Sequence, residues 1–121
     1  MTKEQKENLK KLLDLKIPKN CQFAMSDYFY NGQGYKLNWG FRITKDSYEC
    51  GTTACFAGYL PYVTGIAKKK KELWPEYIFR VTGIKKCSDK FDYLFGYGWD
   101  DDLKEAKIRL KDFINNGYKT F

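Results

Sequence analysis

The chain of 121 residues contains no histidine. Serine and cysteine nucleophiles therefore lack their usual histidine base, and metal sites built on two histidines are excluded. The sequence also lacks a Walker loop, a G-x-G-x-x-G segment and a Cys-x-x-Cys pair. From these absences we expect a protein that is not an enzyme, carries no cofactor and holds no metal.

Long apolar runs are missing as well. No stretch reaches the roughly 18 residues that a membrane span needs, and Met1–Glu4 starts a charged helix rather than a signal peptide. The length suits one domain with its own core, over residues 1–121. We therefore expect a cytoplasmic protein without a membrane partner.

Arginine is scarce, since only Arg42, Arg80 and Arg109 occur among the 22 basic residues. The net charge of +7 attracts nucleic acids, nucleotides and acidic proteins, although a lysine-rich composition is also what AT-rich genomes encode. Arginine is the usual side chain for bidentate recognition of bases and phosphates. Its scarcity argues against sequence-specific reading of DNA.

The residues that could ligate metals have a simpler interpretation. The spacing of Cys21, Cys50, Cys55 and Cys87 fits no common zinc pattern. A site made from all four would require the fold to bring them together, so most are interpreted as small buried hydrophobic residues. The run 100–102 of three aspartates suits a helix start better than a magnesium site.

The capping pattern predicts several helices. Thr2 and Gln5 form a capping box, which predicts a helix near residues 3–15 that Pro18 ends. Three further helices are predicted. One starts at Pro75 and ends at Gly83, and the next covers Asp89–Phe95 after a cap at Ser88. The last starts at a cap formed by Asp100 or Asp101 and ends at Gly117.

Alternating apolar and polar residues predict a small β element. Tyr35, Leu37, Trp39 and Phe41 alternate with polar residues or glycine, and turn residues 31–34 precede them. Phe23 and the segment 28–30 are candidates for the partner strand of a β-hairpin. The predicted fold class is therefore mainly α (α+β), a compact helical domain with a small β-hairpin.

The segment Cys50–Tyr59 has the most unusual composition. We expect Thr52 or Thr53 to cap a helix that starts near Thr53 and that Pro61 kinks or stops. Gly51 permits close approach of a ligand, and the amides of a helix start favour anions. The run 68–71 of four lysines after Gly65 is expected to be an exposed connection.

These features predict a site for an anionic ligand. Phosphate is expected at the amides and hydroxyls of this segment together with one arginine, and a base is expected to stack on an aromatic ring. The alternative for Trp99 is that it fills the core beneath the last helix. The predicted ligand-binding residues are Gly51, Thr52, Thr53, Arg42, Arg80, Arg109, Trp99 and Tyr28.

Three segments together carry a resemblance. They are residues 23–28 (FAMSDY), residues 50–59 (CGTTACFAGY), and Trp99 with the segment 106–110 (AKIRL). In this combination the chain resembles a group of small uncharacterised phage and prophage proteins with a C-G-T-x-x-C-x-A-G motif. It departs from them by about twenty inserted residues, 30–49. The resemblance implies a phage origin, a cytosolic setting and no established enzyme activity.

The two lines of argument lead to one hypothesis and one alternative. The hypothesis is a homo-oligomeric binding protein that sequesters a small anionic ligand, such as a cyclic nucleotide used as an immune signal, and thereby counters host defence. The alternative is a protein that binds and inhibits a host defence enzyme or nuclease.

Overall fold

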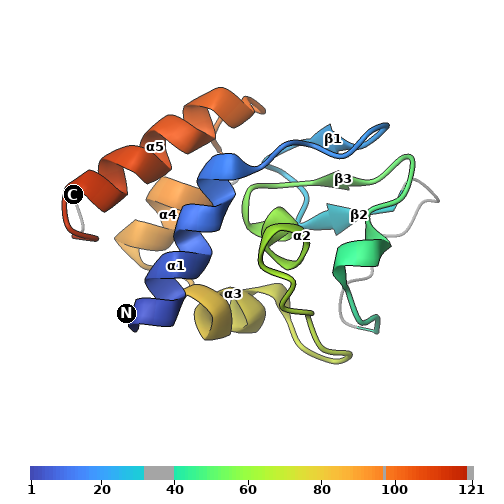
Figure 1. The fold of residues 1–121 in the computed structure, drawn as a ribbon, viewed down its shortest axis with the longest axis horizontal. Coiled ribbons are helices and arrows are strands. Elements are labelled where there is room, and N and C mark those ends of the chain that lie inside the picture. The colour runs from blue at the N-terminus through green and yellow to red at the C-terminus, as the bar shows by residue number, and fades with distance from the viewer. Residues whose placement is uncertain (32–39, 97, 120–121) are drawn as a thin grey trace.

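Most of the helices occupy one side of the molecule, and the small sheet lies on the other side with one short helix beside it (Figure 1). The computed structural model describes residues 1–31, 40–96 and 98–119. The fold is a mainly helical α+β domain, as predicted. Its helices are α1 (Lys3–Lys11), α2 (Leu60–Thr64), α3 (Trp74–Thr82), α4 (Asp89–Phe95) and α5 (Leu103–Asn115), and its strands are β1 (Gln22–Phe23), β2 (Phe29–Tyr30) and β3 (Thr53–Ala54).

The capping residues at the predicted helix ends are largely confirmed. Thr2 and Gln5 form the capping box of α1, which a 3₁₀ turn at Leu12–Asp14 extends toward Pro18. Ser88 caps α4, and Gly83 ends α3 in the left-handed conformation. At α5 the cap is Asp102, not Asp100 or Asp101. The Asp101 carboxylate instead accepts a 2.6 Å hydrogen bond from the amide of Met25, far away in the sequence.

The sheet is built around β3, which lies between β1 and β2. β1 is parallel to β3 with Gln22 opposite Thr53, and β2 is antiparallel to β3 with Tyr30 opposite Thr53. The predicted strand 35–41 falls mostly outside the described residues. Phe23 and the pair Phe29–Tyr30 do lie in strands, but β3 separates them.

The predicted helix start at Thr53 is wrong. Thr53 belongs to the central strand, and the first helical turn after it is a 3₁₀ turn at Ala57–Tyr59 that no side chain caps. The backbone of this segment pairs with neighbours on both sides, which satisfies its polar groups better than a single cap would. Thr52 is buried, and neither threonine caps a helix.

Two further expectations in the following segment are corrected. Pro61 lies in the first turn of α2, because a new helix begins at Leu60 and the missing proline N–H is not needed there. Lys68 is fully buried, and its Nζ donates to the carbonyl oxygens of Phe41 and Lys69 at 3.3 and 3.2 Å. Burial lowers the pKa of Lys68. The other lysines of this run are exposed, as expected.

Gly58 lies very close to the backbone of Tyr28 and to the side chain of Ala54. A Cβ at this position would lie 1.7 Å from the carbonyl oxygen of Tyr28 and 3.1 Å from Cβ of Ala54. The Tyr48 hydroxyl donates to the carbonyl oxygen of Gly58 from within the core. Only glycine therefore fits between the segment 24–28 and the core.

Within the described residues, none of the helices has the length and apolar character required to cross a membrane.

We predict that Gly58→Ala destabilises the protein by about 3 kcal/mol or more, because the added methyl group collides with backbone that cannot move without breaking the sheet. Urea unfolding followed by circular dichroism measures the change. Gly40→Ala is the matched control, since nothing among the described residues lies within 4 Å of the added Cβ. Equal stability of the two variants would contradict this account of Gly58.

Candidate functional site

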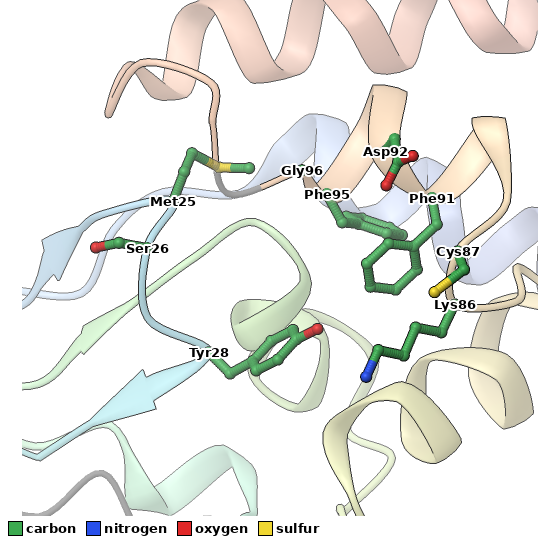
Figure 2. Close-up of a pocket in the computed structure, with 9 residues that line it drawn as sticks. All are labelled: Met25, Ser26, Tyr28, Lys86, Cys87, Phe91, Asp92, Phe95 and Gly96. Carbon is green, nitrogen blue, oxygen red and sulfur yellow. The ribbon is translucent and has the colours of Figure 1, made fainter.

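A cavity of about 320 Å³ lies between α4 and the segment that connects β1 to β2 (Figure 2). Its shape comes from three parts of the chain, namely that segment, the loop between α3 and α4, and one face of α4. The residues that line it are Met25, Ser26, Tyr28, Lys86, Cys87, Phe91, Asp92, Phe95 and Gly96.

Hydrogen bonds donated by backbone amides hold the first wall of the cavity, the segment that connects β1 to β2. The amide of Ala24 donates to the carbonyl oxygen of Ala54 at 3.1 Å, and the amide of Met25 donates to Asp101. The Tyr28 ring stacks on Trp74, with 5.8 Å between ring centres and 14° between planes. Burial raises the pKa of Tyr28 to about 12, so its hydroxyl stays neutral and can donate a hydrogen bond.

The loop after α3 supplies the polar groups of the second wall. Gly83 and Cys87 both adopt positive φ, of 77° and 64°, which turns the chain sharply before the Ser88 cap of α4. Figure 2 shows the Lys86 and Cys87 side chains on one side of the cavity and the Tyr28 ring on the opposite side. A positive φ is strained for cysteine, and such strain often occurs at binding sites.

The third wall is the inner face of α4. Phe91 and Phe95 are buried and packed edge to face, with ring centres 5.7 Å apart. Asp92 and Gly96 complete this wall. Among the described residues that line the cavity, Lys86 is the one cation and Asp92 the one anion. These residues therefore form an apolar slot with a single charge of each sign.

Arg109 and Trp99 come together on the other side of Asp92. The Arg109 guanidinium lies 4.3 Å from the centre of the Trp99 ring, and Trp99 Nε1 donates to the carbonyl oxygen of Asp92 at 2.9 Å. Trp99 is 40 % exposed, so it does not fill the core. A second hollow of about 350 Å³, beside Trp99, shares Asp92 and Gly96 with the cavity beside α4.

The other predicted arginines are elsewhere. Arg80 is held by Glu72, with Nε and Nη2 each 2.8 Å from a carboxylate oxygen, and these hydrogen bonds raise its pKa. Arg42 is exposed and borders a separate hollow of about 190 Å³ beside Phe29 and Glu49. Neither Arg42 nor Arg80 lines the cavity beside α4, and neither takes part in the contact between Arg109 and Trp99.

The predicted anion cradle at Gly51–Thr53 is not formed by a helix start. The amide of Gly51 donates to the carbonyl oxygen of Asn20 at 2.8 Å, and that of Thr52 donates to the carbonyl oxygen of Glu49 at 3.0 Å. Amides that already donate within the chain cannot also bind phosphate. Gly51, Thr52 and Thr53 do not line the cavity that contains Tyr28.

Sequence reasoning missed most of the cavity. It selected Tyr28 but not Met25, Lys86, Cys87 or the α4 face. The available signal was the short segment between the Gly83 stop and the Ser88 cap, which brings a lysine and a cysteine to the start of a helix. That signal is weak, because only the fold shows that residues 25–28 lie across the cavity from this lysine and cysteine.

Within the described residues, no group of three or more cysteine and acidic side chains is placed to hold a metal ion. The cysteines are all free, with Cys50 and Cys87 exposed, Cys21 half-buried and Cys55 buried.

Comparisons with known proteins give no family, since no family model, curated protein or solved structure matches the chain.

We predict that Cys50 and Cys87 react quickly with a thiol reagent at pH 8 while Cys55 reacts only after unfolding. Burial raises the pKa of Cys55 to about 11, so about one molecule in a thousand carries its thiolate at pH 8. Mass spectrometry of protein labelled with iodoacetamide for increasing times identifies the modified residues. Cys55→Ser should leave the fast phase unchanged. Rapid native labelling of Cys55 would contradict its burial.

Proposed function

We propose that the protein is a binding protein that holds a small anionic ligand with a flat ring in the cavity beside α4. The observation that carries the proposal is the composition of the walls, where Phe91, Phe95, Met25 and Tyr28 surround an apolar slot and Lys86 supplies one positive charge. Ligand sites are commonly apolar cavities of this size with a few polar groups that fix orientation.

A nucleotide fits these walls chemically. A nucleobase would occupy the slot against the aromatic rings, and the Asp92 carboxylate would accept hydrogen bonds from base N–H groups. The phosphate would lie outside, next to the Lys86 amine, with the neutral Tyr28 hydroxyl as a further donor. Each contact uses a group that already lines the cavity, so no large rearrangement is required.

Sequestration, rather than turnover, is the activity that we propose. No histidine is present to act as a base, and burial raises the pKa of Tyr28, the phenol in the cavity, away from neutrality. The resemblance to small phage proteins supports a role against host defence, with a nucleotide immune signal such as a cyclic nucleotide as the ligand. A homo-oligomer, which has one such site in each subunit, fits the same role.

The test is a thermal-shift screen of nucleoside monophosphates and cyclic nucleotides, followed by calorimetry. A ligand at 100 times its Kd stabilises the fold by about 2.7 kcal/mol. We expect Lys86→Ala to weaken binding of the best nucleotide about tenfold or more, because a charge-assisted hydrogen bond is worth about 1.5–3 kcal/mol. Lys70→Ala removes the same charge from an exposed position and is the matched control.

Protection of Cys87 gives an independent readout of occupancy. In a Cys50→Ser background, bound nucleotide should slow alkylation of Cys87, which lines the cavity, and should leave Cys21 unaffected. A screen without any stabilising nucleotide, or equal loss of affinity in Lys86→Ala and Lys70→Ala, would refute the proposal. Recovery of a chemically altered nucleotide would replace sequestration with an enzyme activity.

A further inference from the structure

Arg109 is a buried charge that the fold itself does not satisfy. The residue is 7 % exposed, and its Nε and Nη2 atoms are buried without a hydrogen-bond partner among the described residues. A buried N–H group of a charged side chain normally has a partner, because leaving it unpaired costs stability. The guanidinium therefore has unused binding capacity.

The two unpaired atoms form one edge of the guanidinium. The Nε–H and the Nη2–H on the same side point in parallel, and this edge matches the two oxygens of a carboxylate or a phosphate. The flat face of the same group is already occupied by the Trp99 ring. The orientation of Trp99 is fixed in turn by its Nε1 bond to the carbonyl oxygen of Asp92. The unused edge is thus held in a defined direction.

Neighbouring carboxylates do not take this edge. Asp100, Asp102 and Glu105 are near enough to act on the Arg109 charge, yet none forms an ion pair with it in the described parts of the chain. Glu105 precedes Arg109 by one turn of α5 and is the obvious competitor. Because its charge acts on Arg109, the experiment must include a variant of Glu105.

We propose that the Nε–Nη2 edge of Arg109 is a binding site for an oxyanion, carboxylate or phosphate, beside the Trp99 ring that packs on the face of the same guanidinium. Since both atoms are closed off from solvent, a side chain that buries this edge must move before the oxyanion can enter. This site is separate from the cavity that contains Lys86 and does not depend on the nucleotide proposal.

The scarcity of arginine makes a direct test practical. In ¹⁵N-labelled full-length protein, the three arginines give three Nε–H signals, which Arg109→Lys and Arg42→Lys assign. Inorganic phosphate and acetate are titrated separately, with chloride at matched ionic strength as the control for screening. We expect one of the two oxyanions, or both, to shift the Arg109 signal saturably, while the exposed Arg42 and the paired Arg80 shift far less. The stronger oxyanion identifies the natural chemistry as phosphate or carboxylate.

The variants separate this site from general charge effects. Arg109→Lys keeps the charge but lacks the edge, so affinity read from the Trp99 indole N–H signal should fall at least tenfold. Arg42→Lys and Lys86→Ala should leave it unchanged. If neither oxyanion moves the Arg109 signal, or if all three signals move in parallel, the inference is wrong. It is also wrong if binding appears only in Glu105→Gln, because Glu105 then occupies the edge. Should Arg109→Lys fail to fold, the titration of the unaltered protein still decides.

Discussion

The contact between Gly58 and the backbone of Tyr28 is the constraint on which the rest of the structure depends. It joins the turn after β3 to the segment that connects β1 with β2, at a spacing that excludes any side chain. Because β3 pairs with both other strands, the same contact fixes the whole sheet against α2. The wall of the cavity formed by residues 25–28 is therefore held against the core at Tyr28.

Tyrosine hydroxyls extend this constraint through the core. Tyr59 donates to the carbonyl oxygen of Gln22, and Tyr77 donates to that of Ile66, each at 2.6 Å, while Tyr48 donates to Gly58. In each case the ring is buried and the hydroxyl satisfies a backbone carbonyl in a segment outside the regular helices. Burial raises the pKa of all three phenols, so the hydrogen stays in place as a donor. The high aromatic content is thus largely structural, and an excess of tyrosine in a sequence is weak evidence for a ligand surface.

Prediction from the sequence succeeded where a local interaction decides the structure. The capping box at Thr2, the Ser88 cap and the left-handed stop at Gly83 each depend on residues within one helical turn, and the structure has all of them. It failed where distant pairing overrides local preference. Thr53 has good cap chemistry, but strand partners 31 and 23 residues away in sequence, Gln22 and Tyr30, outweigh it. The buried Lys68 follows the same rule, because the carbonyls that receive its amine belong partly to the distant Phe41.

In the candidate site, too, the residue types were predictable from the sequence but their contacts were not. Arg109 and Trp99 were predictable as ligand-binding types, but their contact depends on α5 lying against the end of α4, which no local pattern encodes. The structure also separates groups that one site was expected to combine. Lys86 and apolar rings line one cavity, Arg109 packs against Trp99 beside another hollow, and Asp92 borders both hollows. The negative charge of Asp92 disfavours a single anion that bridges both sites, since it would lie beside the path. Two separate anionic groups, one at each cation and each kept apart from this carboxylate, agree better with the charge distribution.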